Sequence, residues 1–232
     1  MGKRIIPRAR GAGGPRYRSP SHRYRGRVQY FPFGSMSAQV VNILHDPGRS
    51  APVAVVKSDG KTVLQIAPEG LQVGSVIKYG GDVAIGNVIE LSNIPEGTKI
   101  SGIETYPGSG PKICRSSGVF AQVLGKSGDK VSLQFSSGVI KDIDARCRAT
   151  IGIPAASGRT EKPWMKTGTE WYAKHARGKV FPRSAGVAQT ATDHPYGGRS
   201  KRPRPSRTVS RHAPPGQKVG SISAKRVGKR KG

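Results

Sequence analysis

Residues 53–66 read VAVVKSDGKTVLQI, and this stretch decides the fold class of the chain. Two runs rich in Val, Leu and Ile, residues 53–56 and 62–66, flank the polar residues 58–61. The Asp59-Gly60 pair tolerates the positive φ angles of a tight turn, so the stretch predicts a β-hairpin.

Runs of the same type lie on both sides of this hairpin. They occupy residues 38–44, 75–79, 87–91, 99–104, 118–124, 131–135 and 139–143. Short strands at even spacing with Gly and Asp turns between them indicate small β-barrels. About ten strands are too many for one such barrel, so we predict two small barrels in series, with residues 93–97 as a hinge. After Ala149 the pattern ends, apart from one or two helical turns at residues 166–177.

The charge of the chain is unevenly distributed. The formal net charge is +27, yet no acidic residue precedes Asp46 and none follows Asp193. Residues 1–45 carry +9, residues 46–144 carry no net charge, residues 145–193 carry +6 and residues 194–232 carry +12. Lys and Arg tails without acidic neighbours bind polyanions favourably, because each neutralised phosphate releases condensed counterions. The distribution predicts a nucleic-acid partner.

The N-terminal residues 1–35 favour RNA in particular. Arginines there alternate with Tyr17, Tyr24, Tyr30 and Phe31. Guanidinium groups bind phosphates while aromatic rings stack on exposed bases. The alternative is a disordered solubilising tail. We expect removal of residues 1–35 to leave the barrels folded. Residues 178–232 have no periodicity and are predicted to be disordered in the isolated chain.

Other classes of protein find little support. No apolar run reaches the roughly 20 residues of a membrane span, and no apolar stretch follows Lys3 and Arg4 to form a secretory signal. Cys114 and Cys147 stand singly and are predicted to be buried free thiols, with a disulfide or a metal site as alternatives. We expect an intracellular chain in a reducing compartment.

Motifs of catalysis and metal binding also fail on inspection. Residues 125–127 (GKS) resemble the end of a phosphate-binding loop, but Phe120 stands where that motif requires glycine, so a hairpin turn is predicted there. The five histidines are scattered and neither cysteine belongs to a CxxC pair. Asp193 and His194 are adjacent, and adjacent side chains usually point apart, while Pro195 forces His194 into extended geometry. We predict no enzymatic activity and no metal site.

Residues 186–199 (GVAQTATDHPYGGR) differ from the rest of the tail. They hold the last acid of the chain, a histidine, an aromatic ring and two glycines that allow close backbone approach. This combination predicts a compact loop against an irregular RNA surface.

At this loop the sequence resembles the universal large-subunit ribosomal protein two family in its archaeal and eukaryotic form, and the resemblance covers nearly the whole chain. The matching pieces are residues 2–6 (GKRII), 67–71 (APEGL), 93–98 (NIPEGT), 146–152 (RCRATIG), 186–188 (GVA), 193–195 with 197–198 (DHP and GG) and 213–220 (APPGQKVG).

The resemblance implies a fold that is mainly β. An OB-fold barrel at residues 36–90 would precede an SH3-like barrel at 91–160, with basic RNA-binding extensions at 1–35 and 161–232. It further implies a structural constituent of the large ribosomal subunit in translation. Such a primary rRNA-binding protein supports subunit association, tRNA placement and the peptidyl transferase centre, which the DHP-x-GG loop approaches.

The chain departs from the family pattern in the same loop. The family usually has Met-Asn-Pro where this chain has residues 189–191 (QTA), and Gly where it has Arg199. Tyr196 replaces a second histidine of the bacterial form, so a mechanism that needs that imidazole does not apply. We expect His194 to contact RNA and to hold the loop, not to catalyse.

The candidate RNA-binding residues come from both extensions. They are Arg4, Arg8, Arg10, Arg16, Tyr17, Arg18, Arg23, Tyr24, Arg25, Arg27, Arg183, Gly186, Asp193, His194, Pro195, Gly197, Gly198, Arg199, Lys201, Arg202, Arg204, Arg207, Arg211, Lys218, Lys225, Arg226, Lys229 and Arg230.

The expected partners are large-subunit rRNA and neighbouring ribosomal proteins, with tRNA and the small subunit reached indirectly. We expect no membrane contact, no homo-oligomer and no cofactor, apart from Mg²⁺ that accompanies the rRNA. The expected location is the cytoplasm, within the large subunit. Two rival classes stay open, an architectural DNA-binding protein and an RNA-processing enzyme.

Overall fold

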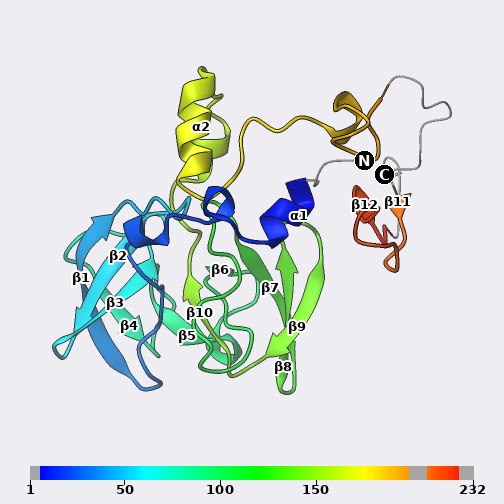
Figure 1. The fold of residues 1–232 in the computed structure, drawn as a ribbon. Coiled ribbons are helices and arrows are strands. Elements are labelled where there is room, and N and C mark those ends of the chain that lie inside the picture. The colour runs from blue at the N-terminus through cyan, green and yellow to red at the C-terminus, as the bar shows by residue number, and fades with distance from the viewer. Residues whose placement is uncertain (1–5, 199–207, 225–232) are drawn as a thin grey trace. The chain divides into compact units, whose positions relative to one another are not determined.

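The computed structural model describes residues 6–198 and 208–224 (Figure 1). The chain divides into two compact units. The β unit is Ser21–Lys166, and the terminal unit combines Met1–Pro20 with Thr167–Gly232. The two units are described separately below.

The β unit is built on one ten-stranded sheet with the order β3-β2-β1-β4-β5-β10-β6-β7-β8-β9. The predicted hairpin is confirmed, because β2 and β3 pair antiparallel through a turn in which Asp59 and Gly60 have φ angles of 45° and 75°. The mainly β class is confirmed, and the strand order is consistent with an OB-fold followed by an SH3-like barrel. The strands are β1 (Met36–Leu44), β2 (Val53–Ser58), β3 (Lys61–Ile66), β4 (Val76–Tyr79), β5 (Val88–Glu90), β6 (Lys99–Ser101), β7 (Ala121–Ser127), β8 (Lys130–Phe135), β9 (Ile140–Asp144) and β10 (Arg148–Ile151).

Three hydrophobic clusters fill the β unit, and the two larger ones meet at β5. Val88 belongs to the cluster that contains Tyr79, while the next residue, Ile89, belongs to the cluster that contains Ile100 and Leu133. Consecutive side chains of a strand point to opposite faces. Strand β5 therefore contributes to both cores.

Strand β10 was not predicted. It pairs antiparallel with β5 on one side and β6 on the other, and all four of its residues are buried. Its sequence, RATI, alternates polar and apolar residues over only four positions, yet the polar Arg148 and Thr150 are buried as fully as their apolar neighbours. Alternation normally indicates a strand with one face in water, whereas here the polar face is buried against partners elsewhere in the chain, such as Glu104.

Two predictions about loops need correction. Residues 93–97 are not a hinge, because Ile94 is fully buried in a core and the Gly97 N–H donates to the Val123 carbonyl oxygen at 2.8 Å. Residues 125–127 are not the turn but the end of β7, and the turn follows at Gly128, whose φ is 53°. Strand β8 begins directly after it, so a phosphate-binding loop is still ruled out there.

The predicted N-terminal extension is divided between the two units. Val28, Tyr30 and Phe31 are buried within the β unit. Tyr30 and Phe31 pack edge-on against the Tyr79 ring, with ring centroids 6.4 Å and 5.3 Å from it. The prediction that all four aromatics of this stretch stack on RNA bases was therefore wrong for these two.

The terminal unit consists mostly of turns and short elements. Helix α1 (Ile6–Gly11), which was not predicted, is followed by a 3-10 turn at Pro15–Tyr17. Helix α2 (Thr167–His175) confirms the predicted helical turns, and a Glu170–Lys174 ion pair and a Trp171–His175 ring stack support it. The two-residue strands β11 (Thr208–Val209) and β12 (Ser221–Ile222) pair in parallel. Among the described residues, no helix is long and apolar enough to cross a membrane.

Candidate nucleic-acid interface

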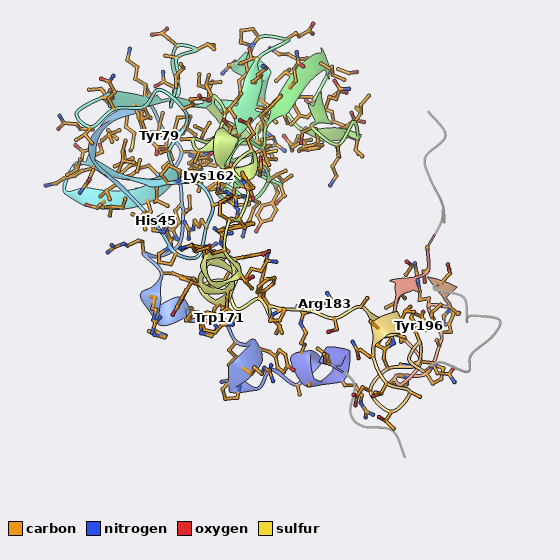
Figure 2. All side chains as sticks on the ribbon, turned by 90° about the horizontal axis from the view of Figure 1, so that it is seen from above. His45, Tyr79, Lys162, Trp171, Arg183 and Tyr196 are labelled. Carbon is orange, nitrogen blue, oxygen red and sulfur yellow. The ribbon has the colours of Figure 1, made fainter. Side chains whose placement is uncertain are left out.

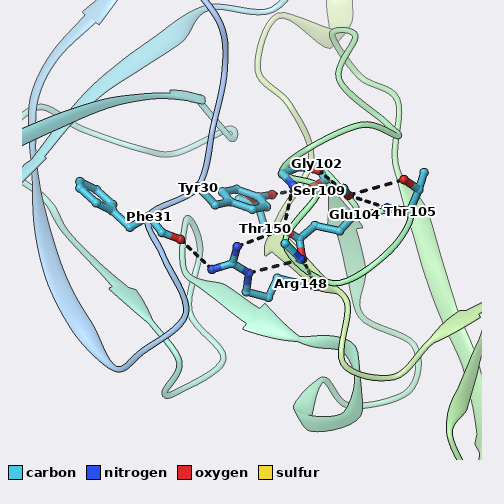
Figure 3. A network of polar contacts seen from close by, with 10 residues as sticks. Tyr30, Phe31, Gly102, Glu104, Thr105, Ser109, Arg148 and Thr150 are labelled. Carbon is cyan, nitrogen blue, oxygen red and sulfur yellow. Dashed lines mark hydrogen bonds and ion pairs between the residues drawn. The ribbon is translucent and has the colours of Figure 1, made fainter.

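A buried ion pair anchors the point where the N-terminal extension enters the β unit (Figure 3). The Arg148 Nη2 and Glu104 Oε1 atoms are 3.0 Å apart, and both side chains are almost fully buried. Arg148 Nη1 also donates to the Phe31 carbonyl oxygen at 2.8 Å. The extension is therefore held to β10 through its own backbone.

Tyr30 makes a second anchor beside the first. Its hydroxyl donates to the Gly102 carbonyl oxygen at 2.6 Å and lies 2.7 Å from Thr150 Oγ1 (Figure 3). Burial raises the pKa of Tyr30 far above its usual range, so the phenol stays neutral. The candidate residues Arg23, Arg25 and Arg27 immediately precede this anchored stretch and are exposed on the β unit.

In the terminal unit, candidate residues from opposite ends of the chain line one cavity of about 350 Å³. Arg10, Arg16 and Tyr17 come from the N-terminal extension, and Arg183 and Asp193 come from the C-terminal one. Figure 2 labels Arg183 on the irregular segment that follows α2. These five residues were predicted to bind RNA on separate grounds, some from charge and some from the loop motif, and the structure places all five on one concave surface.

The loop that contains the DHP motif is closed by contacts within itself. The Thr190 hydroxyl donates to Asp193 Oδ2 at 2.8 Å, and the Tyr196 N–H donates to His194 Nδ1 at 3.0 Å. The Gly198 N–H donates to the Gln189 carbonyl oxygen at 3.2 Å. Asp193 and His194, although adjacent, therefore bind different partners that hold the loop.

The glycines of this loop are required by steric contacts inside the protein. A Cβ atom at Gly186 would lie 2.6 Å from Nδ1 and 2.7 Å from Nε2 of the His194 ring. At Gly197, which is buried, a Cβ would lie 2.5 Å from the Gln189 carbonyl oxygen and collide with that of Thr190. The close backbone approach predicted for this glycine is thus made to the chain itself.

Val219 is a residue of this region that sequence reasoning missed. Its carbonyl oxygen accepts a hydrogen bond from the Tyr196 hydroxyl at 3.1 Å, and its side chain is buried. The Tyr196 hydroxyl thus connects the loop to residues 213–220 through this hydrogen bond. The only signal was that residues 213–220 match the family, which did not indicate a contact with position 196.

The remaining candidates differ in accessibility. Tyr24 is half-buried and its ring packs on Gly48, where a Cβ would lie 2.9 Å from ring atoms. Arg8, Arg18, Arg211 and Lys218 are exposed, and Pro195 is half-buried. Outside the described residues lie Arg4, Arg199, Lys201, Arg202, Arg204, Arg207, Lys225, Arg226, Lys229 and Arg230.

The two units differ sharply in charge. The terminal unit contains 22 basic and two acidic residues, a formal net charge of +20, whereas the β unit contains 18 basic and 11 acidic residues, a charge of +7. A surface with so little acidic compensation attracts polyanions from a distance and binds them with a strong dependence on salt. The terminal unit is thus the main electrostatic feature of the molecule.

The cysteines agree with the prediction of buried free thiols. Cys114 and Cys147 are both buried and unpaired with each other. Burial raises the pKa of each thiol to about 11. In the part of the chain that the structure describes, no group of three His, Cys, Asp or Glu residues could hold a metal ion.

A mainly β unit joined to a strongly basic unit of turns and loops is typical of the class of nucleic-acid-binding proteins. Comparison with known families makes this specific. Residues 5–79 match the family described as Ribosomal Proteins L2, RNA binding N-terminal domain, and residues 84–218 match Ribosomal Proteins L2, C-terminal domain. The chain belongs to the ribosomal protein L2 family, a structural family without enzymatic activity of its own.

Full-length relatives agree with this assignment. The chain is 47% identical to the large ribosomal subunit protein uL2 of Methanothermobacter thermautotrophicus and 48% identical to that of Methanosphaera stadtmanae, with complete coverage of both chains in each case. It is 43% identical to the protein of the same name from Methanopyrus kandleri, over 99% of this chain and 98% of that one. The resemblance to the archaeal form is confirmed.

Proposed function

We propose that this protein is a structural constituent of the large ribosomal subunit, located in the cytoplasm, that binds large-subunit rRNA mainly through its terminal unit. The observation that carries the proposal is the cavity shared by Arg10, Arg16 and Arg183, because it lies in the unit that holds +20 of the net charge. The family description also assigns RNA binding to residues 5–79, which include the exposed Arg23, Arg25 and Arg27.

The finer roles rest on the family and belong to the same proposal. The loop at residues 186–198 lies near the peptidyl transferase centre, and the protein supports subunit association and tRNA placement. Neighbouring ribosomal proteins contact it directly, whereas it reaches tRNA and the small subunit only indirectly. The protein is a single copy without a cofactor, and Mg²⁺ at the site accompanies the rRNA. The division of the β unit into barrels at residues 36–90 and 91–160 stays a prediction.

The proposal is tested by the salt dependence of rRNA binding by the full chain. Affinity should fall steeply with salt, because each neutralised phosphate contributes a slope of about −0.7 to −0.9 in log K against log salt. The double variant Arg10→Gln with Arg183→Gln should flatten the slope by about 1.4 to 1.8. The matched control, Lys130→Gln with Lys141→Gln, removes two exposed charges from β8 and β9 and should leave it nearly unchanged.

Two results would contradict the proposal. A shallow slope for the unaltered chain would mean that phosphate contacts do not dominate the affinity. A preference for duplex DNA over large-subunit rRNA would favour the rival class of architectural DNA-binding proteins. Co-sedimentation of the chain with large ribosomal subunits at low salt is the accompanying positive result.

A further inference from the structure

The cavity lined by Arg10, Arg16 and Arg183 in the terminal unit combines basic, aromatic and hydrogen-bonding lining. The guanidinium groups of Arg10, Arg16 and Arg183 contribute its basic part. Among the described residues, none of these three arginines forms an ion pair. The segments outside the described residues, 1–5, 199–207 and 225–232, contain no Asp or Glu. Asp193 also lines the cavity and accepts the Thr190 hydroxyl through Oδ2 at 2.8 Å, so three guanidinium groups face one carboxylate and a net positive charge is left for an external anion.

Tyr17 supplies an aromatic surface in the same cavity. It is half-buried, and no ring or cation–π contact within the described part of the chain involves it. Tyr30 and Tyr79, by contrast, contact each other's rings. Tyr17 ends the 3-10 turn Pro15–Tyr17, which holds the backbone from which its ring projects.

The rest of the lining is partly apolar and partly hydrogen-bonding. Ile6, Val180 and Pro182 provide apolar surface, whereas Ser184 and Gln189 provide polar groups. The Gln189 side-chain amide donates to the Ser184 carbonyl oxygen at 3.2 Å, which holds the amide in place. A ligand that fits must therefore carry an anionic group. It must also have a flat part whose faces are apolar and whose edge carries hydrogen-bonding groups.

We propose that this cavity receives one unstacked nucleotide of the rRNA. A nucleotide has that combination of properties, with a phosphate for the arginines, a base face for Tyr17 and base-edge groups for Gln189 and Ser184. The volume of about 350 Å³ is at the small end of the range for ligand pockets, which suits one nucleotide and not a helix. An acidic peptide would satisfy the arginines but would leave the aromatic and edge-polar lining without a partner.

This inference rests on the proposed rRNA binding, and Tyr17 variants test it separately. Tyr17→Leu in the full chain should weaken binding to large-subunit rRNA by about 5- to 150-fold, the range for loss of one base–aromatic stack. The salt slope should not change, because the ring carries no charge. Tyr17→Phe should bind like the unaltered chain, because it keeps the ring.

The matched control is Tyr106→Leu, which removes an exposed tyrosine of the β unit. Thermal unfolding of each variant confirms that it is folded. Chemical probing of the rRNA should show one base protected by the unaltered chain and by Tyr17→Phe but reactive with Tyr17→Leu.

The outcomes separate the two proposals. If the unaltered chain shows no salt-dependent rRNA binding, the proposed function fails. If it binds but Tyr17→Leu binds equally well, or the protected base stays protected, the nucleotide pocket is wrong and the function stands. If Tyr17→Phe is as weak as Tyr17→Leu, the ring does not stack and the inference is also overturned.

Discussion

The ion pair between Arg148 and Glu104 predicts a large loss of stability for Glu104→Gln. The glutamate side chain is fully buried and that of Arg148 is 8% exposed. Glu104 also accepts backbone N–H groups of Gly110 and Arg148, each at 3.0 Å. An amide of the same shape would leave the guanidinium of Arg148 buried without its counter-charge and would place an NH₂ group toward donors.

The size of the effect follows from the burial of both partners. Removing one member of a buried pair costs about 3–5 kcal/mol, because the remaining charge is uncompensated. At roughly 2–4 °C per kcal/mol for a domain of about 150 residues, the melting temperature should fall by about 6–20 °C. Urea unfolding followed by far-ultraviolet circular dichroism measures the free energy, and a thermal scan measures the shift.

The matched control removes a carboxylate from the surface of the same unit. Asp82 pairs with Lys78 at 3.3 Å, and its side chain is 86% exposed. Asp82→Asn should therefore cost at most about 1 kcal/mol, the upper end for exposed pairs. If Glu104→Gln cost no more than Asp82→Asn, the pair would not anchor the extension to β10, and the reasoning from burial would be refuted.

Three further predictions concern the extension, the loop and the thiols. Deleting residues 1–20 should leave the melting temperature of the β unit unchanged. Deleting residues 1–33 also removes the buried side chains of Val28, Tyr30 and Phe31, worth about 1.5–3 kcal/mol each, and should lower that melting temperature strongly. Equal melting temperatures for the two deletions would contradict this. Gly197→Ala should shift the NMR signals of residues 186–198 widely because a Cβ meets two carbonyl oxygens, whereas Gly216→Ala, which meets open space, should shift only its neighbours. Burial raises the pKa of both thiols to about 11, so their contribution to the free energy of unfolding is fully present below pH 9 and should be lost as the pH rises from 9 to 11. Urea unfolding midpoints that are the same between pH 9 and 11 as at pH 7–8 would exclude the effect.

Local sequence was a good guide wherever the structure depends on near neighbours. The hairpin at Asp59 and Gly60 formed as expected, because turn geometry is set by the φ angles that these two residues tolerate. Helix α2 followed for a similar reason, since its ion pair joins residues four positions apart. Strand β10 was missed because it has only four residues, and the sequence pattern does not show that its polar residues, Arg148 and Thr150, are buried.

The candidate site shows the same division. Charge counting located the basic segments, and the family motifs located the DHP loop. Neither could show that Arg10 and Arg183 line one cavity, since these residues lie far apart in the sequence. The reason for the glycines was also hidden, because the atoms that a Cβ at Gly197 would meet are known only once the loop is closed.

By itself the sequence determined the β character, the separation of charge and the family of this protein, because propensity, net charge and motif are properties of short segments. The tertiary structure decided which aromatic residues of the N-terminal extension remain available to RNA. Tyr17 lines a cavity, whereas Tyr30 and Phe31 are buried in a core. The physical reason is that burial depends on distant partners, such as the Arg148 guanidinium that binds the carbonyl oxygen of Phe31 across 117 positions of the chain.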